Sequence, residues 1–296
     1  MHYIIGVDGG GTKTEAVAYD LDGNVLDKSL TGFANLINGK EEALNNIVDA
    51  IKRLINEYGL KDLKGLYLGI AGAETGNNVS IIKEEINKKI GITPVVVNDG
   101  ELALRAMLKG EDGILTIAGT GSIAFGIKEN KSARCGGWGH ILGDEGSGYK
   151  LSIEAIKNMI YEYDNSLEKS KLTIKLMEKL NIKEVDEIID FVYSSSKDKI
   201  AVGAPVVSML AEEGDALAKK ILEDEARALA KTTENVYKKL GFEKCSIGLV
   251  GGVVRKSKIF RATFEKALNE NINVISFIDD DVSAAKGAYY MYKKTI

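Results

Sequence analysis

Residues 8–14 place three glycines behind an aspartate, a combination that could bind a polyphosphate. Glycine lets a backbone turn bring its N–H groups close to an anion. Thr12 and Thr14 add hydroxyl donors to this turn, and Lys13 adds a cation. The carboxylate of Asp8 suits Mg²⁺, which prefers oxygen ligands and retains several of its waters. We therefore expect this segment to be an anion site with a cation beside it.

A plain hairpin turn is the alternative interpretation, because β-rich stretches at residues 3–7 and 14–19 flank the glycines. A hairpin turn needs one or two glycines, whereas this segment has three behind an aspartate. The P-loop pattern G-x-x-x-x-G-K-[ST] is absent, and the dinucleotide fingerprint must open a helix where a strand is expected here. Phosphate binding is favoured, and a second motif is needed to decide.

A second glycine-hydroxyl turn, Gly119-Thr120-Gly121-Ser122, lies between two further apolar strands at residues 114–118 and 123–127. The strand, glycine turn and strand thus occur twice, although the module is too short to prove a duplication. Two such turns facing each other across a cleft could hold a polyphosphate without a Walker lysine. Backbone N–H groups and Mg²⁺ would then carry the charge.

Asn98 and Asp99 follow an apolar strand at residues 94–97 directly. A carboxylate at this edge points into the crevice where open α/β sheets bind ligands. Asp99 could then accept a proton from an attacking hydroxyl during phosphoryl transfer. A helix N-cap is the alternative, since Asn and Asp are both favoured there. Both interpretations stay open.

The stretch 135–149 contains six glycines in fifteen residues, together with the only tryptophan and one of two histidines. These features predict a substrate loop in which Trp138 offers an apolar platform and Asp144 a carboxylate for sugar hydroxyls. His140 could be a base, but a histidine beside Trp and Ile is more often a packing residue. Residues 144–147 could also cap the helix that follows. Gly251 and Gly252 end another strand, and either a packing turn or a nucleotide contact would explain them.

The elements around these motifs predict an α/β protein. The segment 146–241 reads as almost wholly helical, and Pro205 is its only proline. No long linker is present, so we expect a domain boundary of crossing elements near residue 113. Further predicted strands span residues 25–30, 66–71, 245–250 and 273–275, and predicted helices span 41–58, 79–90, 258–268 and 282–292.

The composition argues against several classes of partner. The 39 basic and 43 acidic residues give a net charge of −4, without the basic excess typical of nucleic-acid binding. No apolar stretch approaches the roughly 20 residues that a membrane helix needs. Cys135 and Cys245 lack CxxC spacing, so neither a disulfide scaffold nor a zinc site is favoured. We expect a cytoplasmic protein with neither nucleic-acid nor membrane partners.

Taken together, the motifs resemble the sugar-kinase, hsp70 and actin superfamily. More narrowly, they are similar to the N-acetylglucosamine kinase-like members of the BadF/BadG/BcrA/BcrD ATPase family. The motifs that carry the resemblance are residues 8–14, Asn98-Asp99, residues 119–122, residues 136–140 with 143–147, and residues 249–252.

The resemblance implies two actin-like (ribonuclease H-like) domains, each with a mixed five-stranded sheet flanked by helices, around a central cleft. The first would span residues 1–112, joined by the last helix at about 282–296, and the second would span 113–281 with a helical insert. The resemblance also implies ATP and Mg²⁺, a homodimer, and transfer of phosphate to the 6-hydroxyl of an N-acetylhexosamine. N-acetylglucosamine is favoured, and N-acetylmuramic acid or glucosamine is the alternative.

The resemblance assigns roles to individual residues. Asp99 would be the catalytic base and Asp8 the metal ligand. The nucleotide would be held by Gly10, Gly11, Thr12, Lys13, Thr14, Gly119, Thr120, Gly121, Ser122, Gly251 and Gly252. The sugar would be held by Asn35, Asp99, Gly137, Trp138, Gly139 and Asp144.

Two other functions occur on the same fold. The activator branch of the family drives a partner CoA-ester reductase or dehydratase and holds an iron–sulfur cluster by cysteines. Cys135 and Cys245 are the only cysteines here, and Cys135 lies inside the substrate-loop motif, which favours the kinase. Sugar-sensing regulators usually add a helix-turn-helix segment, whereas this sequence starts at its first strand.

Overall fold

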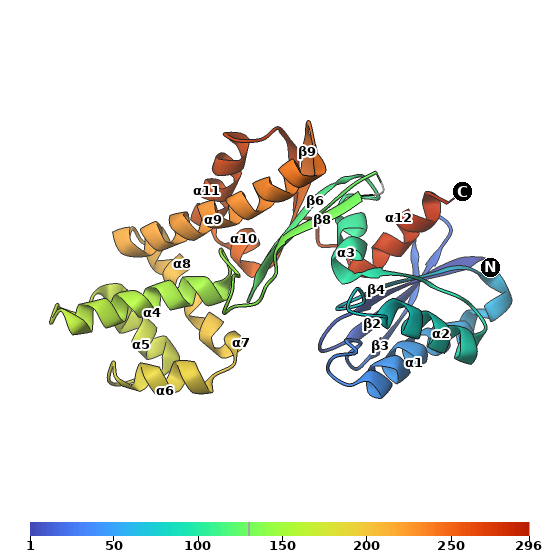
Figure 1. Cartoon of the computed structure of the whole chain (residues 1–296), viewed down its shortest axis with the longest axis horizontal. Helices are drawn as coiled ribbons and strands as arrows, with labels where there is room; N and C mark the ends of the chain where they lie inside the picture. The colour runs from blue at the N-terminus through green and yellow to red at the C-terminus, as the bar shows by residue number, and fades with distance from the viewer. Residues whose placement is uncertain (130, 296) are drawn as a thin grey trace. The chain divides into compact units, whose positions relative to one another are not determined.

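The computed structural model describes residues 1–129 and 131–295. The chain divides into two compact units. Unit 1 consists of Met1–Gly113 and Asp280–Ile296, and unit 2 consists of Ile114–Asp279. Figure 1 labels the elements of both units.

Unit 1 is built on a five-stranded mixed sheet with strand order β3-β2-β1-β4-β5. β2 pairs antiparallel with both β1 and β3, whereas β1, β4 and β5 run parallel. The parallel strands therefore all end at one edge of the sheet. The strands are β1 (Tyr3–Gly9), β2 (Thr14–Asp20), β3 (Val25–Thr31), β4 (Leu63–Ile70) and β5 (Val95–Asn98).

The alternation of side chains along β1 gives the unit 1 sheet two covered faces. Tyr3, Ile5 and Val7 pack with α1 (Lys40–Tyr58) and α2 (Asn78–Ile90). Ile4 belongs to a different cluster, with side chains of the C-terminal segment. That segment contains η3 (Ala284–Lys286) and α12 (Gly287–Lys293), and α12 packs beside α3 (Asp99–Met107) (Figure 1).

The close contact between β1 and the C-terminal segment depends on Gly6. A Cβ atom at Gly6 would lie 2.1 Å from the carbonyl oxygen of Ala285 and 2.7 Å from the Cβ of Ala288. Any larger residue would push the segment off the sheet, because such distances are far inside van der Waals contact. The last residues of the chain are thus part of the core of unit 1.

Unit 2 repeats the arrangement with strand order β10-β9-β6-β7-β8. Its first strand is central, the next two lie on one side of it and the later two on the other, as in unit 1. The predicted fold of two mixed five-stranded sheets flanked by helices is therefore confirmed. The strands are β6 (Gly113–Ala118), β7 (Ser122–Lys128), β8 (Lys131–Gly136), β9 (Cys245–Val250) and β10 (Val274–Ile278).

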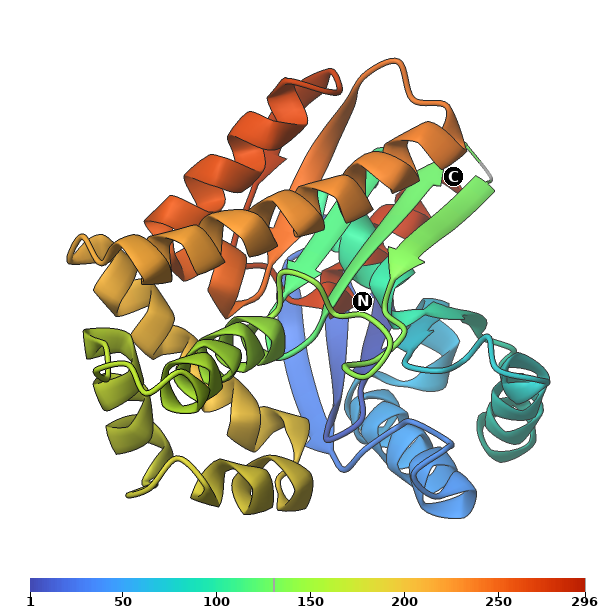
Figure 2. The same cartoon turned by 60° about the vertical axis from the view of Figure 1, so that its left-hand side comes forward.

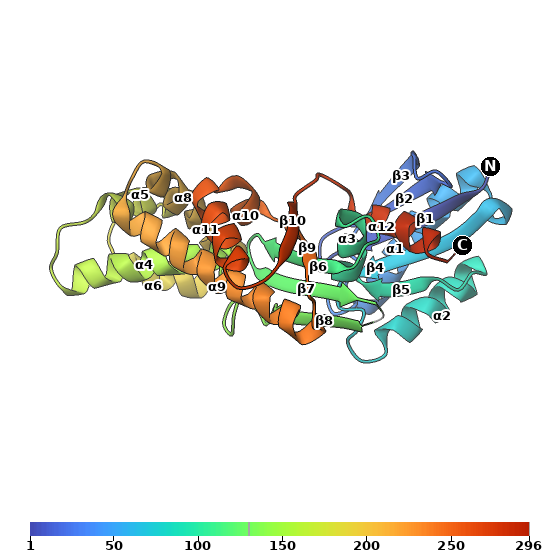
Figure 3. The ribbon, with the colours of Figure 1, turned by 90° about the horizontal axis from the view of Figure 1, so that it is seen from above.

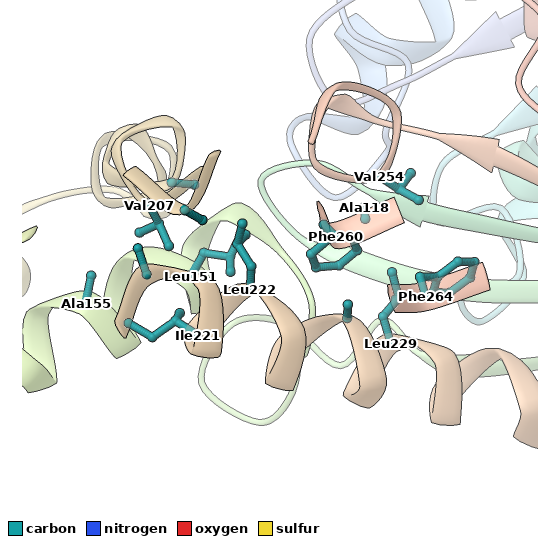
Figure 4. Packing of buried hydrophobic residues seen from close by; sticks show 14 of the residues in the cluster. Ala118, Leu151, Ala155, Val207, Ile221, Leu222, Leu229, Val254, Phe260 and Phe264 are labelled. Carbon is teal, nitrogen blue, oxygen red and sulfur yellow. The ribbon is translucent and has the colours of Figure 1, made fainter. Parts of the chain in front are cut away.

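The long helix α9 (Ala216–Leu240) crosses β7 and β8, and α11 (Lys258–Asn269) packs along it (Figures 2 and 3). Figure 4 shows Phe260 and Phe264 of α11 near Leu229 of α9, all three fully buried. Within the described residues no helix is long and apolar enough to cross a membrane. The remaining helices of unit 2 are α4 (Gly148–Asp164), α5 (Lys171–Leu180), α6 (Glu187–Ser194), α7 (Lys197–Ile200), η2 (Ala201–Gly203), α8 (Ala204–Glu212) and α10 (Gly252–Lys256), and unit 1 also has η1 (Leu60–Asp62).

Candidate active site

The first glycine turn joins β1 to β2 and is packed at one end and open at the other. A Cβ atom at Gly9 would lie 2.5 Å from Cδ1 of Ile70, so packing requires glycine there. At Gly10 and Gly11 the nearest atoms to such a Cβ lie 3.6 and 3.8 Å away. The Gly10 N–H donates to the Lys13 carbonyl (2.9 Å) and closes the turn. Ligand access is therefore at Gly11 and beyond, where Thr12 and Lys13 are exposed.

Asn35 lies in a loop that hydrogen-bonds to the first glycine turn. The Ala34 N–H donates to the Gly10 carbonyl (2.9 Å), and the Asn38 side-chain amide donates to the Gly11 carbonyl (3.0 Å). The amide oxygen of Asn35 accepts the N–H of Ile37 (3.0 Å). This bond orients the Asn35 side chain and leaves its NH₂ group as the part that could meet a ligand.

The hydroxyls of Thr14 and Ser122 are both used inside the fold. Thr14 is fully buried and donates to the Gly32 carbonyl (2.7 Å). Ser122 is 6% exposed and donates to the Glu145 carbonyl (2.7 Å). A hydroxyl that is buried and already donating is not available to a phosphate oxygen. These hydroxyls hold their turns in place, and no local pattern distinguishes Thr14 and Ser122 from Thr12 and Thr120.

Two acidic side chains predicted to act together are close enough to interact. Asp8 lies near the end of β1 and Asp99 directly after β5, at the edge where the parallel strands end. Burial, and then the negative charges of Asp99 and Glu15, raise the pKa of Asp8 to about 6, while Lys13 opposes the shift. Burial also raises the pKa of Asp99. The structure thus places a partly desolvated carboxylate pair near the first glycine turn.

The capping role in α3 belongs to Asn98. Its side-chain oxygen accepts the Gly100 N–H at 2.8 Å, and its backbone is extended as an N-cap requires. Asp99 is the first helical residue, and one of its oxygens lies 3.0 Å from the same N–H. Because Asn98 supplies the cap, the second carboxylate oxygen of Asp99 is available for other chemistry.

The second glycine turn is fastened to the start of α4. The Gly119 carbonyl accepts the Gly148 N–H (2.8 Å), and the Thr120 carbonyl accepts the Tyr149 N–H (3.2 Å). Ser147 caps α4 by accepting the Lys150 N–H at 3.2 Å. The carbonyls of Gly119 and Thr120 therefore face α4, the Gly119 N–H donates to the Gly121 carbonyl (3.0 Å), and Gly119 has open space where a side chain would be.

Two cavities of unit 2 meet at this turn, and Gly119 and Thr120 line both of them. The larger cavity measures 590 Å³ and the smaller 390 Å³. Both volumes lie in the range of small-molecule sites. Gly252 lines the larger cavity, whereas Gly121, Ser122, Gly137, Gly139 and Asp144 line the smaller one.

The larger cavity also contains residues that sequence reasoning missed. One wall is a face of the helical stretch η2–α8, and the opposite lining comes from α10 and Ser257. The sequence does contain a signal for them. Ala201, Ala204, Ser208 and Glu212 are spaced three or four positions apart, which places them on one face of a helix. The full set missed here is Ala201, Ala204, Pro205, Ser208, Met209, Glu212, Val253, Lys256 and Ser257.

Gly251 and Gly252 have different roles. Gly251 has φ +104°, and a Cβ atom there would lie 2.3 Å from the Ala118 carbonyl oxygen. Only glycine combines that backbone conformation with such a close approach. A Cβ atom at Gly252 would have no atom within 4 Å, and Gly252 lines the larger cavity. The packing interpretation therefore fits Gly251, and the ligand-contact interpretation fits Gly252.

The glycine-rich loop divides into an exposed and a buried part. Trp138 is 64% exposed and stacks on the guanidinium of Arg134, which lies 4.2 Å from the ring centre. Asp144 is 3% exposed, and its carboxylate lies 3.4 Å from the Ser122 N–H. His140 packs edge-on against Tyr149 at 4.9 Å, which fits a packing residue. Asp144 thus lies against the second glycine turn, whereas Trp138 is an exposed ring stacked on Arg134.

Glu225 of α9 is another residue whose role was not predicted from the sequence. Its carboxylate accepts the N–H of Gly146 at 2.6 Å and so ties the glycine-rich loop to α9. The two residues are far apart in the sequence, and no local pattern marks Glu225 among the acidic residues of its helix. The bond fixes the backbone two residues after Asp144.

The two cysteines of unit 2 lie in different environments. Cys245 is buried in β9, and burial raises its pKa to about 12. Such a thiol stays protonated at neutral pH. Cys135 is half-buried on β8. Across the described parts of the chain, no group of three or more His, Cys, Asp or Glu residues is placed to hold a metal by itself.

Comparison with known proteins gives consistent matches over nearly the whole chain. The model of the BadF/BadG/BcrA/BcrD ATPase family matches residues 5–291. The N-acetylmuramic acid/N-acetylglucosamine kinase of Clostridium acetobutylicum is 36% identical over 298 residues, which cover 97% of each chain. The N-acetyl-D-glucosamine kinase of Dictyostelium discoideum is 30% identical over 304 residues, covering 96% of this chain and 95% of the relative. A solved Chromobacterium violaceum structure, described as a candidate N-acetylglucosamine kinase, shares the fold with TM-score 0.71 and 21% identity over 98% of both chains.

Proposed function

The chain belongs to the BadF/BadG/BcrA/BcrD ATPase family, and on that premise we propose that it is an ATP-dependent amino-sugar kinase. The reaction transfers the γ-phosphoryl group of ATP to the 6-hydroxyl of an N-acetylhexosamine. N-acetylglucosamine is the favoured substrate, and N-acetylmuramic acid and glucosamine are the other candidates. The two relatives that match nearly the whole chain bear the names of kinases for the first two of these sugars.

The observation that carries the proposal is the carboxylate pair Asp8 and Asp99. The two charges interact, both side chains are partly desolvated, and the capping role that could have explained Asp99 belongs to Asn98. A carboxylate next to the residue that caps the helix, in a partly desolvated site beside a glycine turn, fits a general base for phosphoryl transfer.

The chemistry of the proposed step requires little from the protein beyond positioning. The oxygen of the sugar 6-hydroxyl forms a bond to the γ-phosphorus, and the bond from that phosphorus to the β–γ bridging oxygen breaks to release ADP. Asp99 accepts the hydroxyl proton. Burial raises the pKa of Asp99, which makes it a better proton acceptor than an exposed aspartate.

Mg²⁺ fits the acidic residues of unit 1. Asp8 carries a carboxylate whose ionisation is opposed by Asp99 and Glu15, and a bound cation would relieve that repulsion. Because the described residues offer no complete protein cage, Asp8 would hold the ion together with waters and the nucleotide phosphates, as is usual for Mg²⁺. When bound, Mg²⁺ neutralises charge on the phosphates.

We assign nucleotide contacts within each unit separately. The larger cavity takes the base and ribose, with Gly252 in its lining, and the second glycine turn holds phosphates through Gly119 and Thr120. Within unit 1, we assign phosphate contacts to Gly11, Thr12 and Lys13. For the sugar we assign Asn35, Asp99, Gly137, Trp138, Gly139 and Asp144.

A coupled ADP-release assay with Mg-ATP and a panel of hexoses, amino sugars and N-acetyl sugars tests the proposal. Strong release with one or two amino sugars is the expected result. ³¹P NMR of the product then identifies the phosphorylated position, and a 6-deoxy sugar should be inert. ADP release that is indifferent to sugar would favour a partner-driven ATPase and contradict the proposal.

The resemblance also favours a homodimer. A cytoplasmic location is favoured because the proposed reaction uses ATP and because Cys135 and Cys245 are free thiols. Sedimentation velocity checks the first point, and cell fractionation checks the second.

A further inference from the structure

Lys197 contributes a charge to the smaller cavity of unit 2 that none of the roles above uses. It lines that cavity together with the second glycine turn and Asp144. Lys197 and Asp144 are the charged residues of this lining. Lys197 is exposed, and within residues 1–129 and 131–295 its ammonium has no ion-pair partner. Asp144, by contrast, is buried beside the Ser122 N–H. The cation is therefore available to a ligand, while the carboxylate is partly engaged.

A helical stretch of the chain carries Lys197 toward the second glycine turn. α7, η2 and α8 follow one another without a gap from Lys197 to Glu212. The residues of this stretch that line a cavity recur every three or four positions and so share one face. Along that face, Lys197 lines the smaller cavity, and Ala201, Ala204, Pro205, Ser208, Met209 and Glu212 line the larger one.

Packing around Gly148 places this face next to Gly119. A Cβ atom at Gly148 would lie 3.2 Å from the Gly119 carbonyl oxygen and 3.6 Å from the Cβ of Ala201. Lys197 precedes Ala201 by four positions, about one helical turn or 6 Å. The flexible four-carbon stem of lysine covers such a distance easily. An ammonium starting one turn from Ala201 can thus reach an anion bound at the glycine turn.

We infer that Lys197 binds the terminal phosphates of the nucleotide. The inference rests on the proposed function, because it takes the second glycine turn to be the phosphate site. A polyphosphate bound there would lie near the negative charge of Asp144, and a cation offsets that repulsion. Lysine suits this task because it binds phosphate as a movable point charge. The base and ribose are assigned to the larger cavity, so their binding should not depend on Lys197.

Binding of ATP, ADP and adenosine to the Lys197→Met variant, measured by calorimetry without sugar, tests the inference. We expect about 10- to 100-fold weaker ATP and ADP binding, the range for a lost charge-assisted contact. Adenosine binding should not change. Lys197→Arg should recover part of the affinity, because it keeps the positive charge. Lys199→Met is the matched control, since Lys199 is an exposed lysine of the same short helix that lines neither cavity.

Three results would overturn the inference. They are unchanged ATP affinity in Lys197→Met, an equal loss for adenosine and ATP, and an equal loss in Lys199→Met. A fourth concerns the sugar: if the variant weakens only N-acetylmuramic acid binding, Lys197 binds the lactyl carboxylate and not phosphate. The nucleotide measurements contain no sugar, so a wild-type protein that phosphorylates none of the sugars would contradict the proposed function while leaving this test intact.

Discussion

Asp8 and Glu15 lie directly opposite each other in the β1–β2 ladder, so their side chains point to the same face of the unit 1 sheet. Glu15 has partners, because Ser283 donates to it at 2.5 Å and the ammonium of Lys28 lies 3.9 Å away. The negative charges of Glu15 and Asp99 raise the pKa of Asp8, and Lys13 is the charged group that lowers it. An edge with this charge distribution favours a bound cation, and it makes the ionised form of Asp8 costly without one.

The Asp8→Asn variant should be more stable than the wild type at neutral pH in EDTA. The pKa of Asp8 is raised to about 6, so its contribution to stability is fully present below about pH 4 and is lost as the pH rises through 6. Above pH 7 the ionised carboxylate costs at most about 3 kcal/mol, which the amide removes. Thermal unfolding at pH 4.5, 6.0 and 7.5 should show the advantage of the variant growing with pH. A constant difference across this range would contradict the assignment, and kinase activity should be lost at every pH.

The Asp99→Asn variant should lose catalysis while it keeps sugar binding. Removal of a general base lowers kcat by about 10²- to 10⁴-fold, whereas the amide still hydrogen-bonds the sugar hydroxyl. Asn98→Ala is the matched control, because it removes the α3 cap next door and should cost about 1 kcal/mol of stability with most activity kept. Steady-state kinetics and sugar titration measure both effects. Wild-type turnover in Asp99→Asn would remove Asp99 from its role.

The neighbours Gly251 and Gly252 should respond differently to alanine. Gly251→Ala places a methyl group against the Ala118 carbonyl in an unfavourable backbone conformation, and we expect a loss of about 1–3 kcal/mol or more. Gly252→Ala meets no atom within 4 Å and should unfold like the wild type, but its methyl group enters the larger cavity. Nucleotide binding should weaken in Gly252→Ala at unchanged melting temperature. Full nucleotide affinity in that variant would argue against the nucleotide assignment of the larger cavity.

Glu225→Ala should affect the sugar more than the nucleotide. Loss of the carboxylate leaves the buried N–H of Gly146 unpaired, which costs about 1–3 kcal/mol and loosens the backbone next to Asp144. We expect a raised KM for the sugar, a smaller change in KM for ATP, and recovery in Glu225→Gln, which keeps an acceptor. Asp224→Asn is the control, since Asp224 forms exposed pairs with Lys220 and Arg227 of the kind that contribute little. If Glu225→Ala loses stability without any change in the KM for the sugar, Glu225 stabilises the fold but does not affect sugar binding.

Local sequence patterns predicted nine of the ten strands that the structure describes and the places of both glycine turns, whereas β8 (Lys131–Gly136) was missed and the two five-stranded sheets followed from the resemblance. Alternating apolar residues predict the strands, and glycines flanked by strands predict the turns, because each depends on neighbours in the chain. The carboxylate Asp99 after a parallel strand was found in the same way. The family resemblance supplied the sugar residues, which no spacing rule would have selected.

Tertiary packing decided which donors in the motifs remain available. Thr12 and Thr14 look alike in the sequence, yet Thr14 is buried against the Gly32 carbonyl and Thr12 is exposed. The sequence left open whether Asp99 caps α3 or takes part in catalysis, and the structure places Asn98 at the N-cap and Asp99 at the first helical position. These differences depend on atoms from elsewhere in the fold, so local chemistry could not distinguish them.

The positions of Lys197 and Glu225 were likewise decided by the tertiary structure alone. Both lie on helices rich in charged residues, where the sequence gives each of them the same description as its exposed neighbours. Lys197 lines a cavity because α7 packs near the second glycine turn, and Glu225 reaches Gly146 because α9 passes the start of α4. The sequence by itself thus predicted most of the strands and the two turns from periodicity and local motifs, and the resemblance carried by those motifs supplied the family and the two-sheet fold. Only the folded chain determined which charged side chains meet them, because that depends on contacts between residues far apart in the sequence.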